Sequence, residues 1–217
     1  MMRINALTAL CLAALLTGCA TPTPYDYSAL RESNPRSILV LPPVNQTLDT
    51  KASYSFLSQV TYPLAESGYY VLPVAVVDQT FRENGMVNPE DIHGLPLDKL
   101  QTVFGADAAL YITISKYGTS YQLISSDTRV TAEATLIDMR SGQLLWKGAA
   151  TASSTEQNNN TSGGLVGLLV QALVDQIANS ITDRSHEIAG ITSARLLSSN
   201  APKGLLPGPR SPHYTRQ

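Results

Sequence analysis

Three successive β-segments between Ala108 and Ser153 constrain the fold of this chain more than any other feature. The first segment, 108–117, alternates apolar residues with polar or aromatic ones, as in a strand that buries one face. Its apolar set is Ala108, Leu110, Ile112 and Ile114, and its other set is Tyr111, Thr113, Ser115 and Tyr117. The second segment, 128–138, alternates in the same way, and its inward set is Val130, Ala132, Ala134 and Leu136. The two alanines predict that a helix lies close against that face.

A short turn and a third segment complete this pattern. Residues 138–142 end in glycine, which suits the positive φ of a type I turn followed by a bulge. The third segment, 143–153, carries Trp146, the only tryptophan. We therefore predict an antiparallel meander at the centre of the fold.

The residues ahead of the meander predict strands and helices in alternation. Apolar runs at 37–44 and 69–74 are typical of buried strands, and amphipathic helices are expected at 51–67 and 74–84. Pro63 marks a kink or the last turn of the first helix. A smaller helix at 96–104 is expected to face inward with Leu97, Leu100 and Val103. The βαβα order favours parallel pairing of the first two strands.

The longest predicted helix follows the meander. A polar, glycine-ended loop at 156–164 leads to a helix at 165–187, whose stripe is expected to pack on the sheet. The stripe consists of Val166, Val170, Leu173, Ile177 and Ile181. The predicted fold class is α/β: a mixed sheet of about five strands, βαβα and then the meander, covered by helices and closed by a long C-terminal helix.

The N-terminus predicts export and lipidation. Arg3 precedes an apolar run at 6–16, too short to span a membrane as a mature helix, and the run ends in Leu-Thr-Gly-Cys at 16–19. This tetrad matches the lipobox of bacterial lipoproteins, in which cleavage before the cysteine is coupled to its acylation. We predict a signal peptide at 1–18 and a lipid-modified Cys19. The alternative is an ordinary signal peptide with an incidental cysteine.

The compartment and domain plan follow from that cleavage. Loss of Cys11 with the signal peptide leaves Cys19 as the only cysteine, so no internal disulfide can form. Ala20, rather than aspartate, follows Cys19, which by resemblance to sorted lipoproteins favours the outer membrane, on its periplasmic or its external face. We predict a membrane tether at 19–36, one domain at 37–200 and a disordered tail at 201–217.

The charge distribution excludes nucleic acid as a partner. The formal net charge is -2, and residues 19–200 carry an excess of six acids over bases. Binding to a phosphate backbone requires a basic face, and this domain is acidic. The basic residues of the tail are Lys203, Arg210 and Arg216.

No pattern in the sequence predicts catalysis, a metal or a cofactor. The histidines, His93, His186 and His213, are scattered, and no GxSxG elbow or phosphate loop is present. Asp107, Asp127 and Asp138 lie at strand or loop ends, where solvated turn residues are usual.

Two features could bind a partner. The start of the last predicted helix is apolar nearly all round and belongs either to the core or to a partner or self-oligomer surface. The residues concerned are Leu165, Val166, Leu168 and Leu169. The second feature is a set of tyrosines on the meander, Tyr111, Tyr117 and Tyr121, which suits an interface as well as an ordinary sheet surface.

Several motifs resemble those of periplasmic envelope proteins. They are Gly-Ala-Asp at 105–107, the Asp-x-x-x-Gly turn at 138–142 and Leu-Leu-Trp at 144–146. The pattern is similar to curli-secretion lipoproteins, penicillin-binding-protein activator lipoproteins and the TolB N-terminal domain. Residues 19–197 resemble more closely a Neisseria surface-lipoprotein antigen family of unknown function, on the sequences at 24–45 and 125–134.

The resemblance implies a non-enzymatic accessory or assembly subunit of an envelope or secretion complex. The implied partners are other envelope lipoproteins, including the curli-secretion type, or further copies of this chain. A lipoprotein that activates a peptidoglycan-synthesis or transport enzyme in trans remains the alternative.

Overall fold

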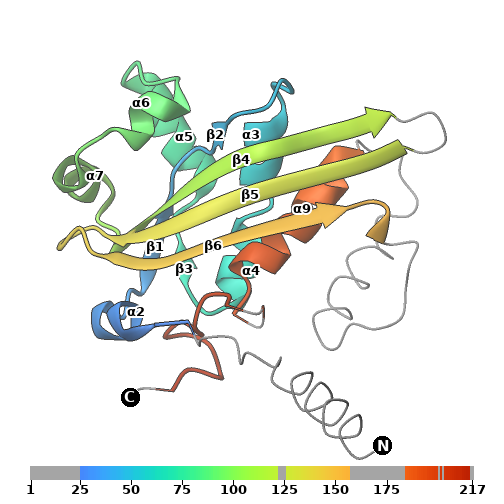
Figure 1. Ribbon diagram of the computed structural model, residues 1–217. Helices are drawn as coiled ribbons and strands as arrows, with labels where there is room; N and C mark the ends of the chain where they lie inside the picture. The colour runs from blue at the N-terminus through green and yellow to red at the C-terminus, as the bar shows by residue number, and fades with distance from the viewer. Residues whose placement is uncertain (1–24, 122–125, 157–183, 200, 202, 216–217) are drawn as a thin grey trace, which may run out of the picture.

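The sheet of this protein is mixed, as the alternation of elements predicts. The computed structural model describes residues 25–121, 126–156, 184–199, 201 and 203–215. Within them, six strands form one sheet in the order β3-β1-β4-β5-β6, and β2 pairs with β4 beyond β1 (Figure 1). The strands are β1 (Ser37–Val40), β2 (Val44–Asn45), β3 (Tyr70–Val71), β4 (Ala108–Tyr121), β5 (Ser126–Asp138) and β6 (Leu144–Ser153). The predicted α/β class is confirmed.

The strand directions also agree with the prediction. Strand β1 runs parallel to β3 and to β4, whereas β4, β5 and β6 form the antiparallel meander. The helices are α2 (Ser28–Ser33), α3 (Ala52–Leu57), α4 (Thr61–Glu66), α5 (Val74–Glu83), α6 (Pro89–His93), α7 (Leu97–Phe104) and α9 (Arg184–Leu197). No helix in the described part of the chain is long and apolar enough to cross a bilayer.

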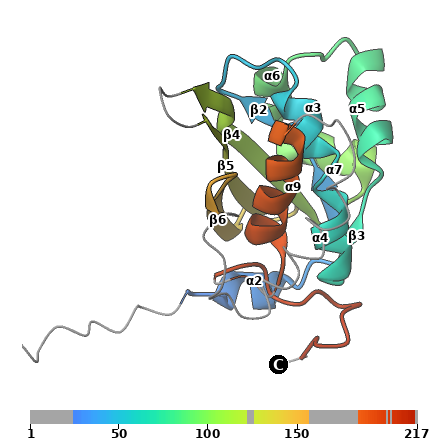
Figure 2. The same cartoon turned by 90° about the vertical axis from the view of Figure 1, so that its right-hand side faces the viewer.

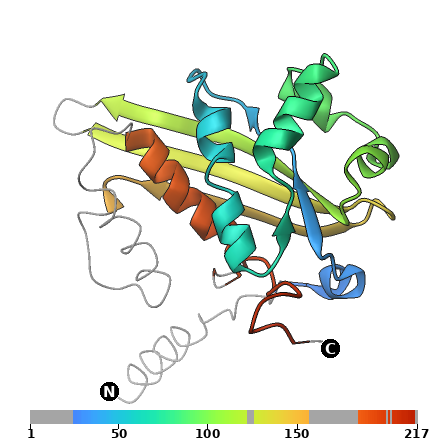
Figure 3. The same ribbon diagram turned by 180° about the vertical axis from the view of Figure 1, so that it is seen from behind.

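Alternate residues along β1 and directly after it belong to two separate apolar clusters. Ile38 and Val40 join the inward set of the meander beneath α3, α4 and α9, which cover one face of the long strands (Figure 3). Leu39 and Leu41 instead pack with residues of α5, α6 and α7. Strand β1 is therefore buried on both faces, which explains its continuous apolar run. No described helix covers the other face of β5 and β6 (Figure 1).

The predicted close approach of a helix to the alanines of β5 is confirmed. Ala132 and Ala134 are buried, and α9 packs along β5 and β6. The Thr192 hydroxyl donates to the Ile188 carbonyl one turn earlier and lies 3.3 Å from the Val130 carbonyl of β5. The helix that packs there is Arg184–Leu197; the predicted helix at 165–187 lies outside the described residues as far as 183.

Prolines shorten the predicted elements of the first half. The strand predicted at 37–44 is two strands, because Pro42 and Pro43 have no N–H to donate to a ladder. The helix predicted at 51–67 is likewise two, α3 and α4. Pro63 is the third residue of α4, where its missing N–H costs no intrahelical bond. Val103, predicted to face inward on α7, is 63% exposed.

A β-bulge moves Tyr117 to the opposite face of the meander. Ile114 pairs with Ala132 and Lys116 with Thr131, so Ser115 is an extra residue in β4. The alternation therefore reverses after Ile114, and Tyr117 is buried with the α3 and α9 cluster rather than beside Tyr111. The tyrosine surface predicted from sequence is consequently wrong for Tyr117, and the side chain of Tyr121 lies outside the described residues.

The predicted tether is part of the folded domain from Tyr25 onward. Leu30 of α2 is 3% exposed and belongs to the main core. The Tyr25 and Tyr27 rings contact each other at a tilt of 46°, with 4.6 Å between centroids, and the Lys147 N–H of β6 donates to the Tyr25 oxygen at 2.8 Å. The boundary predicted at residue 36 is therefore wrong, because α2 completes the core.

The predicted disordered tail is also wrong for residues 203–215. The Trp146 indole N–H donates to the Lys203 carbonyl at 3.0 Å, and the Tyr69 hydroxyl donates to the Leu206 carbonyl at 2.8 Å. Backbone N–H groups of Gly208 and Arg210 then bond to carbonyls after α4. The tail and α2 lie together at one end of the molecule (Figure 2).

Gly68→Ala is expected to release the tail. Gly68 has a φ of +92°, and an added Cβ would lie 2.3 Å from the Ser211 backbone nitrogen. We expect trypsin to cleave after Arg210 several-fold faster in this variant. Gly85→Ala is the matched control, because Gly85 also has positive φ (+77°) but no neighbour within 4 Å. Equal cleavage rates in both variants would show that the tail does not depend on this contact.

Candidate functional site

The residues predicted for lipidation and for the apolar helix surface lie outside the described part of the chain. They are Cys19 for lipidation, and Leu165, Val166, Leu168 and Leu169 for partner binding. Their roles remain predictions. Three places in the described part of the chain could also carry function: a polar network at the start of β4, the surroundings of His186 in α9, and the far end of β4.

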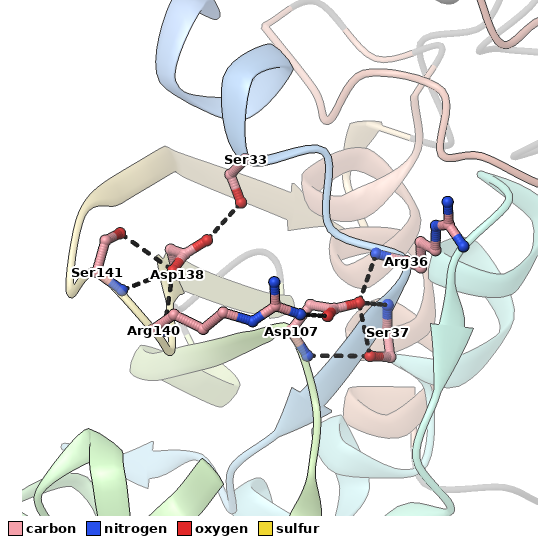
Figure 4. A network of polar contacts seen from close by, with 7 residues as sticks. All are labelled: Ser33, Arg36, Ser37, Asp107, Asp138, Arg140 and Ser141. Atoms are coloured by element: carbon pink, nitrogen blue, oxygen red, sulfur yellow. Dashed lines mark hydrogen bonds and ion pairs between the residues drawn. The ribbon is translucent and has the colours of Figure 1, made fainter.

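Asp107 organises the polar network (Figure 4). One carboxylate oxygen accepts from the N–H groups of Arg36 and Ser37 at 2.9 and 3.1 Å, and from the Ser37 hydroxyl at 3.0 Å. The other oxygen pairs with the Arg140 guanidinium at 2.7 Å. This single side chain therefore joins the start of β1, the start of β4 and the β5–β6 turn.

Asp138 continues the network toward α2. Its carboxylate accepts from the Ser33 hydroxyl at 2.6 Å and from the N–H groups of Arg140 and Ser141. Burial opposes ionisation of Asp138, but these hydrogen bonds outweigh it and lower the pKa of the carboxyl. The Gly-Ala-Asp and Asp-x-x-x-Gly motifs thus lie side by side. Their carboxylates bind backbone and side-chain groups of neighbouring elements and so stabilise the fold.

The histidines do not form a catalytic or metal centre with one another. His186 Nδ1 lies 2.8 Å from the Ser55 hydroxyl, and its Nε2 lies 2.7 Å from the Gln59 amide nitrogen. A neutral amide therefore occupies the place where a nucleophilic triad has a carboxylate. The Tyr117 hydroxyl also donates to Ser55, so the cluster joins α3, α9 and β4.

His93 is held by a different contact. Its Nε2 lies 2.9 Å from the Pro42 carbonyl, which can only accept, so Nε2 carries the proton. Burial lowers the pKa of this imidazole. His213 is exposed in the tail. Among the described residues, no group of three or more His, Cys, Asp or Glu side chains could hold a metal ion.

The far end of β4 differs from both clusters because, among the described strands, only β5 lies beside it. Strand β2 leaves β4 after the Gln46 N–H donates to the Ile114 carbonyl at 2.9 Å. The Asn45 side chain then turns the chain away, accepting from the Thr47 N–H and donating to the Asp49 carbonyl. Beyond that point β4 pairs only with β5 in the part of the chain that is described. We call residues 118–120 the open edge.

A hollow of about 470 Å³ runs beside the open edge. It is lined by Thr47, Ser115, Lys116, Tyr117, Gly118, Thr119, Ser120, Asp127 and Arg129. The Thr119–Thr128 hydroxyl pair (2.8 Å) joins β4 to β5 there, and the Asp127–Arg129 ion pair (2.9 Å) lies within β5. A hydrogen bond from the Ser153 hydroxyl lowers the pKa of Asp127, so this carboxylate stays charged. The surface beside the open edge is thus polar and charged, and its strand is paired with β5.

An open edge is suited to pairing with another chain. A strand that has a neighbouring strand on one side only can extend its sheet by one strand from another chain. The bulge at Ser115 and the exposed Lys116 are features that limit indiscriminate edge-to-edge pairing. Sequence reasoning missed this site because the edge depends on where β2 ends, and no residue of β4 signals it.

Comparisons with known proteins identify close relatives. A profile of the GNA1162-like lipoprotein family matches residues 25–210. The lipoprotein NMB1124/NMB1162 of Neisseria meningitidis serogroup B is 48% identical over 186 residues, 86% of each chain. The crystal structure of lipoprotein GNA1162 from Neisseria meningitidis is 49% identical, with a TM-score of 0.53, and the match covers 67% of this chain and all of that one.

Proposed function

Because this chain belongs to the GNA1162-like family of lipoproteins, we propose that it is an outer-membrane-anchored accessory subunit of an envelope assembly that works by contact. In this proposal it turns over no substrate and needs no cofactor. Its partners are other envelope lipoproteins, including the curli-secretion type, or further copies of itself. The open edge is the single observation that carries the proposal, because no strand in the described part of the chain lies beside it opposite β5, which leaves a place for a partner strand.

A membrane anchor favours contact with partners because it raises their local concentration. A lipid-modified Cys19 confines the domain to a plane that it shares with other anchored proteins. Confinement raises the effective concentration of neighbours, so a modest interface is sufficient for assembly. The apolar residues at 165–170 remain a second proposed contact surface.

Cys19→Ala is expected to abolish incorporation of labelled palmitate in cells. The matched control is Cys11→Ala, which removes the only other cysteine and should leave labelling unchanged, because Cys11 lies in the proposed signal peptide. Undiminished labelling of the Cys19 variant would contradict the anchor.

Cysteine cross-linking in native membranes tests the contact surface. The mature chain has no other free thiol, so Ser120→Cys at the open edge and Leu168→Cys at the second surface each supply a unique probe. Thr102→Cys, on the exposed side of α7, is the control. We expect a discrete adduct from residue 120 and none from residue 102.

The outcomes separate the parts of the proposal. An adduct from residue 168 alone would show that the interface lies at the second surface and not at the open edge. An adduct with a peptidoglycan-synthesis or transport enzyme would favour a regulator acting in trans. The absence of any specific adduct from both probes would contradict the contact function itself.

A further inference from the structure

The domain begins much closer to the proposed lipid anchor than its sequence suggests. Tyr25 is fixed to β6 by the Lys147 N–H, and the Tyr27 hydroxyl donates to the Gly204 carbonyl of the tail at 2.6 Å. Only residues 20–24 separate Tyr25 from Cys19. At full extension these six Cα steps span at most about 22 Å. The end of the domain formed by α2 and the tail therefore stays near any bilayer that holds Cys19.

This end carries an excess of basic side chains. Arg31 and Arg36, at and just beyond the end of α2, and Lys203 and Arg210 in the tail are all exposed. In the described part of the chain none of these four cations forms an ion pair; Arg210 instead lies 5.2 Å above the Tyr70 ring. The acids of the two segments are Asp26 and Glu32.

The rest of the domain has the opposite charge. Residues 37–202 contain fifteen acidic and nine basic side chains, whereas segments 25–36 and 203–215 together contain two acidic and four basic ones. Only the end nearest the anchor is thus net positive. Arg31 also lines a cavity of about 280 Å³ between α2 and the tail, to which Asn34 and His213 contribute. Of the four cations only Arg31 lines this cavity, and Glu32 lines it as well.

We propose that the surface formed by segments 25–36 and 203–215 docks on the headgroups of an anionic lipid leaflet. This inference rests on the lipid anchor of the proposed function. Basic residues within a Debye length of an anionic surface, about 10 Å, are attracted to it. A tether of at most about 22 Å lets them reach that range, and the attraction then holds them there. Docking orients the domain with the loop at 46–51 and α6 turned away from the bilayer (Figures 1 and 3).

The test uses the full mature lipidated chain in vesicles. A fluorophore is placed on Ser28→Cys in α2 or on Leu48→Cys, a fully exposed residue of the loop at 46–51. Vesicles rich in phosphatidylglycerol, or made of phosphatidylcholine alone, carry a nitroxide quencher on the headgroup. We expect salt-sensitive quenching at residue 28 in the anionic vesicles and little quenching at residue 48.

Charge removal isolates the role of the surface. In R31Q/R210Q the ratio of docked to undocked domain is expected to fall by up to about 30-fold, the effect of two cations at the surface. The control is K51Q/R82Q, which removes two exposed cations elsewhere and should quench like the wild type. Arg82 pairs with Asp78 and contacts the exposed Tyr54 side chain, and surface contacts of this kind cost little stability when they are lost.

Two results would overturn the proposal, for different reasons. Quenching at residue 28 that is the same in both lipids and in R31Q/R210Q would show that the tether alone holds the domain near the bilayer. Vesicle flotation is measured in parallel. A chain that does not float with vesicles of either composition would contradict the lipid anchor, and with it both this inference and the proposed function.

Discussion

Ile188→Asp is expected to lower the free energy of unfolding by about 4 kcal/mol, since a charge would be buried without a partner. Ile188 is 1% exposed in α9, within the cluster that joins this helix to the meander. For a domain of this size the melting temperature should fall by about 10 °C. Thermal and denaturant unfolding of the purified domain measure both quantities.

The matched control is Ala194→Asp on the same helix. Ala194 is half-buried, so an aspartate there can reach water and should cost less than about 1 kcal/mol. If both variants unfolded alike, α9 would not pack on the sheet through Ile188.

Asp107→Ala is expected to cost about 3 kcal/mol, the second largest effect. The substitution leaves the N–H groups of Arg36 and Ser37 without their acceptor and removes an ion pair. Hydrogen bonds to a charged group contribute about 1.5–3 kcal/mol each. The Asp107 side chain is 25% exposed, so water can replace part of what is lost.

Arg140→Gln separates the two contributions of Asp107. The Arg140 side chain is 70% exposed, and loss of such a surface ion pair should cost less than about 1 kcal/mol. Chemical denaturation of both variants measures the difference. Equal costs would mean that the ion pair, rather than the backbone contacts, is what Asp107 contributes to stability.

The central meander could be predicted because its signal is local and repeated. Period-2 alternation fixed which residues of β4 and β5 face the core, and Ile112 and Leu136 are fully buried as expected. The alanines of β5 likewise predicted a closely packed helix. Periodicity failed at Ser115, because a bulge is set by the pairing of two strands and leaves no mark in the pattern of one.

The chain ends could not be predicted because their contacts are distant in sequence. The Tyr27 hydroxyl donates a hydrogen bond to the Gly204 carbonyl, and the Trp146 indole donates one to the Lys203 carbonyl. The tail segment that holds Lys203 and Gly204 has no apolar periodicity of its own. Proline-rich, polar segments are typical of tethers and tails, so composition alone favoured disorder. Tertiary hydrogen bonds override that preference here.

The candidate site was accessible to sequence reasoning only in part. The lipobox at 16–19 is a contiguous motif and needs no fold to be recognised. The open edge exists only because β2 is two residues long and leaves β4 at Ile114. The Asp107 and Asp138 motifs were visible in the sequence, but their meeting in one network required the register of β4 and β5.

The size of the native assembly tests the contact function most directly. Membranes from cells that produce the protein are solubilised in mild detergent, and the particle containing this chain is purified and weighed by native mass measurement. The account predicts a discrete complex well above the 23.3 kDa of one full-length chain, reduced in the Cys19→Ala variant. A single chain without stoichiometric partners, in wild-type membranes, would contradict it.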